Sequence, residues 1–137
     1  MVNKLILIVD DEEINREMIG SVLEDAGYNV FKTGNAKTAI TTSMDYKDKI
    51  SVILMDLVMP DNDGFIAITT IKSQRMTKLI PIMALTASSD KASVIKAMNA
   101  GADDYLTKPF DPDELVFRVH NLCKISDFIK RWEVIAK

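Results

Sequence analysis

The sequence predicts an α/β fold, a doubly wound parallel sheet built from five βα units with helices on both faces. Three observations predict it. Short strand-like segments alternate with amphipathic helical segments along the 137 residues. The connections between them are only a few residues long, as in βαβ units. Polar groups follow directly after four of the strand-like segments, which is where open α/β sheets bind their ligands.

The first half of the chain contains two βα units and a third strand. A strand at residues 4–9 precedes a helix at residues 13–26, and Gly27 stands where a left-handed helix cap belongs. A second strand at residues 29–33 leads to a second helix. The third strand, residues 50–55, is apolar except for one serine, as expected for a parallel strand that is buried on both faces.

The second half continues the alternation, with a helix that opens at Gly64, a strand at 81–85, a helix at 90–99 and a strand at 104–107. Pro81 fits the first position of its strand, where no ladder donor is needed. The last helix begins at Asp111 and Pro112, an N-cap aspartate followed by a proline in the first turn. This pattern leaves no linker before residue 124.

Side chains with reactive groups stand at the ends of four predicted strands. Asp10 and Asp11 follow the first strand, Asp56 the third, Thr86 the fourth and Lys108 the fifth. The carboxyl ends of parallel strands meet at one edge of a sheet, so these groups are expected to form one site. Reactive groups after both the first and the third strand indicate that these two strands are neighbours. The expected order is therefore the flavodoxin-like 2-1-3-4-5.

The combination of groups indicates phosphoryl transfer onto an aspartate. Asp10, Asp11 and Asp56 would repel one another in a small volume, so they must take up protons or hold a cation. Ligand oxygens without histidine or cysteine select a hard ion such as Mg²⁺. Lys108 adds a compact positive charge and Thr86 adds a hydroxyl donor. A single aspartate after a strand is often only a solvated residue that caps the next loop. Here the reactive groups at the three other strand ends favour a functional site.

Composition excludes several classes of function. The net charge of −3 argues against nucleic-acid binding, because no basic stripe offsets the acids. The apolar runs are too short to cross a membrane, and the first strand starts too early to leave room for a signal peptide. The single cysteine, Cys123, cannot form an internal disulfide, which agrees with a reducing compartment. We therefore expect a cytoplasmic protein. The single histidine, His120, is expected to lie on the surface of the last helix.

Motifs at the four strand ends resemble the receiver domain of two-component response regulators. They are the acidic segment 8–12, the segment 56–65, the segment 81–87 and the segment 101–110. Each motif alone is weak, but the four occur in the order and spacing of that family. The resemblance covers residues 4 to about 123 and implies a receiver domain at residues 1–123.

The resemblance implies a signalling role with Asp56 as the phosphoacceptor. Asp56 would take a phosphoryl group from a sensor histidine kinase or a histidine phosphotransfer protein, and the domain would then change conformation to signal to a partner or output domain. Asp11 and Asp56 would bind Mg²⁺ directly, with Mn²⁺ as an alternative ion. Asp10 would act through water, and Val58 would contribute its backbone carbonyl. Such a domain is not an enzyme beyond its own phosphorylation and autodephosphorylation.

The resemblance also implies the parts of a switch. Thr86 and Lys108 would hold the phosphoryl oxygens, and Tyr105 would rotate inward when Thr86 moves. The alternative for Tyr105 is a core aromatic residue with its hydroxyl at the surface. The Lys108–Pro109 peptide would be cis.

Two other classes of function fit the sequence less well. A phosphatase of the haloacid dehalogenase type needs a second aspartate two residues after the nucleophile, and Val58 stands there. A flavin-binding protein of the same fold needs a hydroxyl-rich phosphate loop after the first strand. The acidic residues 10–13 stand there instead and would repel a phosphate.

The chain continues past the end of the receiver resemblance. No glycine or proline occurs from Asp113 to Lys137, and apolar residues recur every three or four positions. A continuous helix of about 25 residues would be roughly 37 Å long. Residues 124–137 are therefore expected to extend the last helix beyond the sheet, either as a dimerisation helix that makes a homodimer or as a linker into a missing output domain. A frayed tail or a tag remnant is the alternative.

Overall fold

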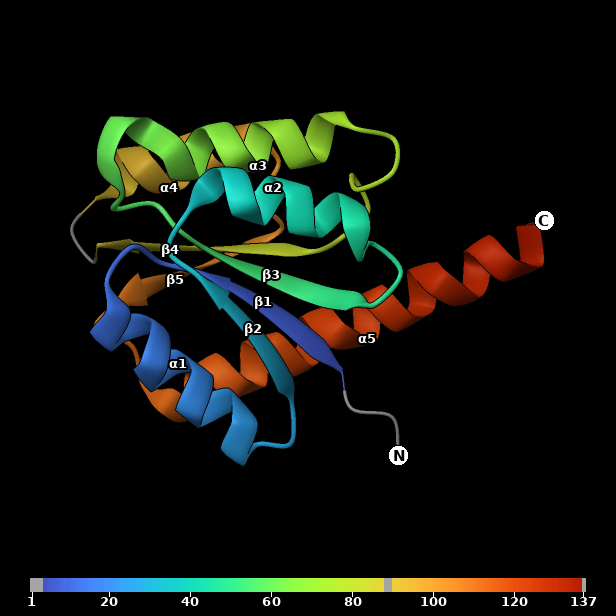
Figure 1. Cartoon of the computed structure of the whole chain (residues 1–137), viewed down its shortest axis with the longest axis horizontal. Coiled ribbons are helices and arrows are strands. Elements are labelled where there is room, and N and C mark those ends of the chain that lie inside the picture. The colour runs from blue at the N-terminus through green and yellow to red at the C-terminus, as the bar shows by residue number, and fades with distance from the viewer. Residues whose placement is uncertain (1–3, 88–89, 137) are drawn as a thin grey trace.

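The computed structural model describes residues 4–87 and 90–136. Strands and helices alternate in the expected order (Figure 1), with the bounds β1 Leu5–Val9, α1 Glu13–Asp25, β2 Asn29–Thr33, α2 Ala36–Asp45, β3 Ile50–Asp56, the 3₁₀ turn η1 Pro60–Asn62, α3 Asp63–Ser73, β4 Ile82–Ala87, α4 Lys91–Ala100, β5 Asp104–Lys108 and α5 Pro112–Ala136. The ends differ from the expected ones by one or two residues, which is usual for element ends. Pro81 precedes β4 instead of opening it, and Asp56 is the last residue of β3.

Local signals in the sequence explain where several helices begin and end. Gly27 has a φ of 98° and follows the end of α1, in the left-handed conformation that glycine adopts without steric cost. The side chain of Asn35 accepts hydrogen bonds from the first backbone N–H groups of α2. Asp111 accepts a hydrogen bond from the backbone N–H of Asp113 at 2.8 Å, as expected for the N-cap of α5.

The five strands form one parallel sheet in the predicted order β2-β1-β3-β4-β5. Every residue of β3 is buried, which explains its nearly continuous apolar sequence. Helices cover both faces of the sheet (Figure 1). Against one face, Ile53 and Met55 of β3 pack in a core with α2, α3 and α4, and against the other, Val52 and Leu54 pack with α1 and α5. Because successive side chains of β3 point to opposite faces of the sheet, this one strand packs against both layers of helices.

The last helix, α5, is continuous over 25 residues, and its two parts have different surroundings. Leu115, Val119, Leu122 and Cys123 are buried against the sheet, whereas the distal part extends beyond the sheet (Figure 1). Cys123 packs as a small buried hydrophobe, and burial raises the pKa of its thiol to about 11. His120 lies on the exposed surface of the helix, as expected.

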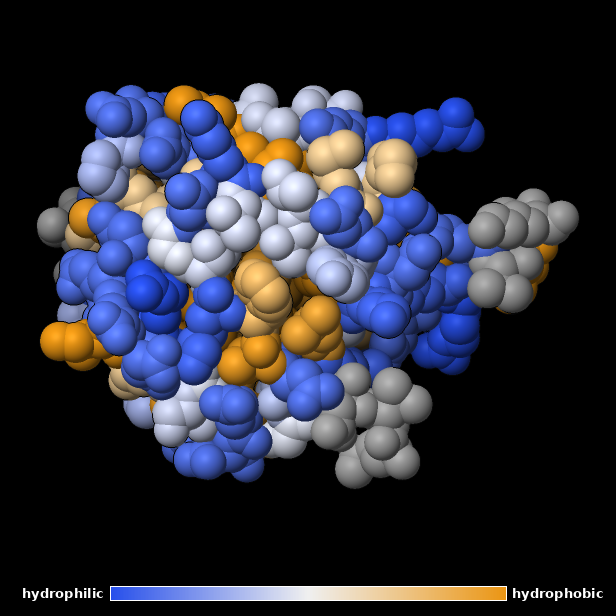
Figure 2. Space-filling view, viewed as in Figure 1, coloured by the Kyte–Doolittle hydropathy of each residue, from blue (hydrophilic) through white to orange (hydrophobic). Residues whose placement is uncertain are grey.

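The surface seen in Figure 2 is mainly hydrophilic, with apolar side chains gathered in a small patch near the edge strand β2. Phe31 of β2 is among the exposed large hydrophobic residues. Among the described residues, no helix combines the length and the apolar character that a membrane crossing needs.

Lys72 of α3 ties the segment before β4 to the loop before β5. Its Nζ donates to the carbonyl oxygens of Ile80 at 2.8 Å and Lys78 at 3.1 Å, and to Asp103 Oδ2 at 2.7 Å. The same Asp103 oxygen accepts the backbone N–H of Ile82 at 2.8 Å. One ammonium and one carboxylate therefore fix the point at which β4 enters the sheet. The sequence offered no sign of this network, because its members are distant along the chain.

We expect Lys72→Met to lower the free energy of unfolding by about 1–3 kcal/mol, because it keeps the alkyl stem but leaves carbonyl and carboxylate oxygens without their donor. Lys37→Met on the exposed surface of α2 is the matched control and should change stability by no more than about 0.5 kcal/mol. Urea unfolding monitored by circular dichroism measures both values. Equal stabilities of the two variants would show that the Lys72 network contributes nothing.

Candidate functional site

The sheet brings the predicted strand-end groups to one edge. Asp10, which follows β1, is 0% exposed and Asp56, at the end of β3, is 1% exposed. Thr86 of β4 is also buried, and Lys108 is the last residue of β5. Because β1, β3, β4 and β5 are successive neighbours in the sheet, four segments that are remote in sequence place their side chains around one point.

A single ammonium group connects the two buried carboxylates. Lys108 Nζ lies 3.1 Å from Asp10 Oδ2 and 3.1 Å from Asp56 Oδ1. A carboxylate without a partner would be very costly at such a buried position, so this contact explains how both can be accommodated. The side chain of Lys108 therefore lies beside the acidic residues, where the sequence predicted it.

Backbone groups hold the two carboxylates in place. Asp10 Oδ1 accepts the N–H of Glu12 at 2.9 Å, and Asp56 Oδ1 accepts the N–H of Val58 at 3.1 Å. Both contacts span two residues, the local turn that aspartate favours. Arg16 of α1 adds a hydrogen bond from Nη1 to the carbonyl oxygen of Asp10 at 2.7 Å. Sequence reasoning missed Arg16, and only its position one helical turn after the acidic segment could have indicated it.

Asp10, Asp11 and Asp56 form a cluster that matches the donor set of a hard divalent cation. Each offers a carboxylate oxygen, and these oxygens all lie within 4.8 Å of one another. Asp11 is exposed while the other two are buried, so the cluster is open on one side. Oxygen donors alone favour Mg²⁺ or a similar ion over the transition metals that histidine and cysteine bind.

The electrostatics of the site leave negative charge in excess. Burial raises the pKa of Asp56, and the nearby charge of Asp10 raises it further, against the opposing effects of the Val58 N–H and of Lys108. Burial by itself would lower the pKa of Lys108, but the charges of Asp56 and Asp10 outweigh it and the pKa lies above its usual value. Lysine is therefore charged, and its single charge does not fully compensate the carboxylates.

The residues expected to form the switch lie on neighbouring strands. Thr86 of β4 is paired in register with Thr107 of β5, and Tyr105 lies two residues before Thr107. Tyr105 is 40% exposed, so its ring is not packed in the core. The Lys108–Pro109 peptide is cis.

The loop after β3 has a backbone conformation that its residue types permit but do not by themselves predict. Asp61 and Asn62 have φ angles of 59° and 58°, the left-handed region that aspartate and asparagine tolerate better than most residues. Gly64 then packs so closely against the strand end that a Cβ atom there would collide with the carbonyl oxygen of Asp56. Glycine at this position is required by the close approach of α3 to the backbone of Asp56.

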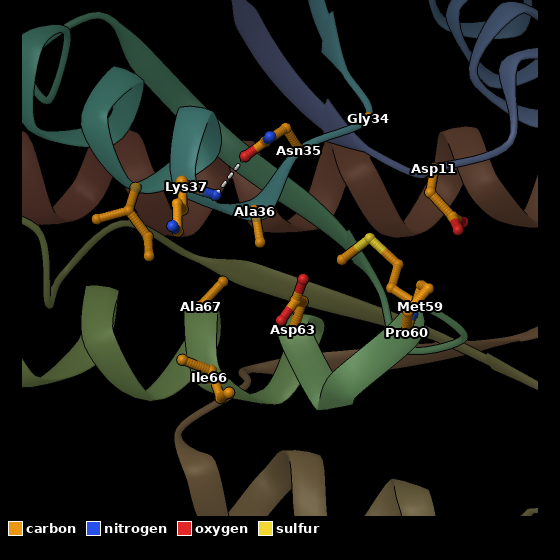
Figure 3. Close-up of a pocket in the computed structure, with 11 residues that line it drawn as sticks. Asp11, Gly34, Asn35, Ala36, Lys37, Met59, Pro60, Asp63, Ile66 and Ala67 are labelled. Atoms are coloured by element: carbon orange, nitrogen blue, oxygen red, sulfur yellow. Dashed lines mark hydrogen bonds between the residues drawn. The ribbon is translucent and has the colours of Figure 1, made fainter.

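Two cavities lie beside the acidic residues. The first, of about 530 Å³, opens between α2 and α3 with Asp11, Met59 and Asp63 at its lining (Figure 3). The second, of about 380 Å³, lies on the α1 side and is lined by mainly apolar residues together with Lys108: Asn15, Met18, Ile19, Val58, Ala87, Pro109 and Phe110. The site can therefore be approached from two sides that differ in polarity.

The sheet order and the acidic cluster at its carboxyl edge are the arrangement that the resemblance to receiver domains implied. The chain belongs to the response regulator receiver domain family, which matches residues 6–120. Receiver domains of this family are not conventional enzymes.

Relatives and solved structures agree with this assignment. The phosphate regulon transcriptional regulatory protein PhoB of Pseudomonas aeruginosa is 43% identical over 119 residues, 87% of this chain and 51% of that protein. The chemotaxis protein CheY4 of Vibrio cholerae aligns with a TM-score of 0.79 and 29% identity, over 88% of this chain and 99% of that one. The chain spans about half the length of the curated relatives it matches.

A third comparison bears on the metal. The receiver domain of the sensor histidine kinase PA1611 from Pseudomonas aeruginosa aligns with a TM-score of 0.80 and 30% identity, over 90% of this chain and 99% of that one. Its structure has a magnesium ion coordinated in the active-site cleft. The cluster of Asp10, Asp11 and Asp56 offers oxygen donors suited to the same ion.

We expect Gly64→Ala to lower the free energy of unfolding by about 1–3 kcal/mol, because the new methyl group must displace the backbone of Asp56. Gly20→Ala in α1 is the control, since its methyl group would meet the flexible Lys32 side chain at 3.0 Å and Val30 at an ordinary contact distance of 3.7 Å. That substitution should leave stability unchanged or raise it by up to about 1 kcal/mol.

Thermal unfolding measures the stabilities, and amide NMR shifts of residues 55–58 report the displacement. A Gly64→Ala variant with unchanged stability and unchanged shifts would contradict the close packing.

Proposed function

We propose that this chain receives a phosphoryl group on Asp56 from a phosphohistidine of a sensor histidine kinase or a histidine phosphotransfer protein. The observation that carries the proposal is the contact of Lys108 with Asp56 and Asp10 beside a third carboxylate. A nucleophilic carboxylate, a cation and a set of metal-binding oxygens are what transfer onto an aspartate requires.

The geometry favours one oxygen of Asp56 as the nucleophile. Within the described part of the chain, the hydrogen bonds to the Asp56 carboxylate, from Val58 and from Lys108, both go to Oδ1. Oδ2 is therefore the oxygen left to attack phosphorus. As the new O–P bond forms, the P–N bond to the imidazole breaks and its electron pair returns to the ring nitrogen, which can take a proton from solvent. Lys108 and Thr86 then stabilise the charge on the phosphoryl oxygens.

The metal ligands follow from the resemblance to receiver domains, and the cluster of carboxylate oxygens supports them. Asp11 and Asp56 would bind Mg²⁺ directly with the Val58 carbonyl, and Asp10 would act through water; Mn²⁺ is an alternative ion. The bound ion supplies the positive charge that lets an anionic donor approach the acidic residues. The exposed position of Asp11 supports this assignment, because a hydrated ion can enter from that side.

The cavity on the α1 side supports a protein as the phosphodonor. Met18 and Val58 are exposed apolar residues at its lining, next to Lys108, and Ile14 nearby on α1 is 82% exposed. An apolar rim beside a charged centre is typical of a protein interface, with an apolar contact surface around the reacting groups. A helix that carries a phosphohistidine fits this surface better than a small polar molecule does.

The position of Tyr105 supports a conformational output. Phosphorylation draws Thr86 towards the phosphoryl oxygens, and the partly exposed Tyr105 ring moves into the space that this opens. The signal then passes to a partner or to an output domain, consistent with relatives about twice as long as this chain. A cytoplasmic location, as expected from the composition, completes the proposal.

Incubation with acetyl phosphate and Mg²⁺ tests the assignment of Asp56. We expect the mass of the protein to increase by one phosphoryl group in an acid- and base-labile linkage, and Asp56→Asn to abolish the increase. Asp63→Asn, at an exposed aspartate near the site, is the control and should be phosphorylated normally. A phosphoryl group that survives on Asp56→Asn would refute the assignment, and so would phosphorylation that a chelator does not reduce.

A second prediction separates the electrostatic role of Lys108 from the switching role of Thr86. Lys108→Ala removes positive charge from Asp10 and Asp56, so it should tighten Mg²⁺ binding while it slows phosphorylation. Thr86→Ala removes a hydroxyl and a methyl group but no charge, so it should leave Mg²⁺ affinity nearly unchanged while it weakens the response at Tyr105. Isothermal titration gives the affinities, and Tyr105 NMR signals report the response. Weaker Mg²⁺ binding by Lys108→Ala would count against the proposed roles.

A further inference from the structure

The distal part of α5 carries four apolar side chains in a row, Ile125, Phe128, Trp132 and Ile135, here named the distal stripe. Their exposed fractions are 50%, 57%, 55% and 73%. They are spaced by three, four and three residues, as the a and d positions of a coiled coil are. The rings of Phe128 and Trp132 meet edge to face, with centroids 6.1 Å apart. The middle of the stripe is therefore one continuous apolar surface.

The heptad positions of the distal stripe are polar further upstream, where the helix packs on the domain. Glu114, Arg118 and Asn121 occupy the same heptad positions further upstream and are all polar. Arg118 forms an ion pair there with Asp104 of β5 at 3.0 Å. From residue 125 onward these positions are apolar. Ser126 is still buried against the domain and Asp127 still pairs with Lys4 at 2.7 Å, so the stripe begins just before the helix loses its contacts with the domain. The distal end of α5 projects beyond the sheet in Figure 1, and an apolar row on a projecting helix indicates a partner for it.

The distal stripe also points away from the domain. The residues by which α5 packs on the body are Leu115, Val119, Leu122, Cys123 and Ser126, all buried. At 3.6 residues per turn, the direction of this packed face and that of the stripe differ by roughly 140° around the helix axis. A second helix can therefore lie along the stripe without displacing any side chain that packs inside the domain.

We propose that the distal stripe binds the same stripe of a second copy of this chain, as a parallel pair of helices. The flanking charges set the direction. Lys124 and Arg131 stand at the g positions beside the seam. In an antiparallel pair each Lys124 would face Arg131 of the other copy, a repulsive contact repeated by the symmetry. In a parallel pair, Lys124 and Arg131 each face the residue five positions further along the helix of the other copy, and both of those residues are uncharged.

The size of the contact sets its strength. Each half-exposed side chain of the stripe can bury on the order of 100 Å², so eight of them from two copies bury about 800 Å². A standard stable interface buries about 1,200–2,000 Å². The stripe alone therefore makes a weak dimer that dissociates on dilution. The pairing is independent of the phosphoryl chemistry, because none of its residues belongs to the site.

Sedimentation equilibrium of the full chain over a concentration series tests the proposal. We expect a monomer–dimer equilibrium, and a rise of at least about tenfold in the dissociation constant for Phe128→Glu and for Trp132→Glu. Phe117→Glu is the matched control, since Phe117 is also more than half exposed on α5 but borders α1. It should leave the dissociation constant unchanged. Trp132 is the single tryptophan, so its emission should shift to shorter wavelength as the dimer forms.

A cysteine substitution tests the direction of pairing. With Ile125→Cys, a parallel pair places the two new thiols face to face, and mild oxidation should link the copies by a disulfide. An antiparallel pair would hold them roughly 15 Å apart along the axis and should give no link. The unsubstituted chain, with Cys123 buried, should stay unlinked under the same oxidation.

Three results would overturn the proposal. They are a chain that stays monomeric at every concentration, a dimer that Phe128→Glu weakens no more than Phe117→Glu does, and a dimer that Ile125→Cys does not link. Circular dichroism confirms that each variant keeps its helices, and Trp132→Glu replaces Phe128→Glu if the latter does not fold. Asp56→Asn should dimerise like the original chain, so failure of the phosphoryl proposal and failure of this one are distinguishable.

Discussion

The contact of Lys108 with Asp10 and Asp56 is the interaction on which the rest of the site depends. It joins the ends of β1, β3 and β5, and β4 lies between the last two, so the lysine side chain must reach across a strand. The order β2-β1-β3-β4-β5 places these ends close together on one edge. Because a buried carboxylate needs a partner, the ion pair and the strand order support one another.

The same contact leaves the site short of positive charge. Three carboxylates form one cluster and one ammonium contacts two of them, and burial together with Asp10 raises the pKa of Asp56. A folded protein tolerates such repulsion at a functional site when the surrounding structure holds the groups in place. A divalent cation would relieve it. A site that is short of positive charge favours such a cation and, beside it, an anionic phosphoryl group, so both parts of the proposed function rest on one electrostatic condition.

Contacts outside the site keep its geometry rigid. Arg16 holds the carbonyl oxygen of Asp10, Gly64 lets α3 approach the backbone of Asp56, and Lys72 with Asp103 fixes the entry to β4. The helix α5 serves two purposes along its length. Its proximal part completes the core beneath β1 and β3, and its distal part presents an apolar stripe to solvent. The structure thus separates the chemistry of the strand ends from the surface proposed for association.

Patterns in the sequence were enough to predict the strands and helices and the chemical groups at the ends of the strands. Hydrophobic periodicity defined the strands and helices, and the positions of Asp10, Asp56, Thr86 and Lys108 after strands predicted one shared site, because parallel strands end at the same edge. The contacts between residues that are far apart in the sequence could be learned only from the folded structure. It set which oxygen of Asp56 is engaged, the network of Lys72, and the need for glycine at position 64. These contacts join residues that the sequence holds apart, and one-dimensional patterns record which groups are present but not how closely the folded backbone brings them together.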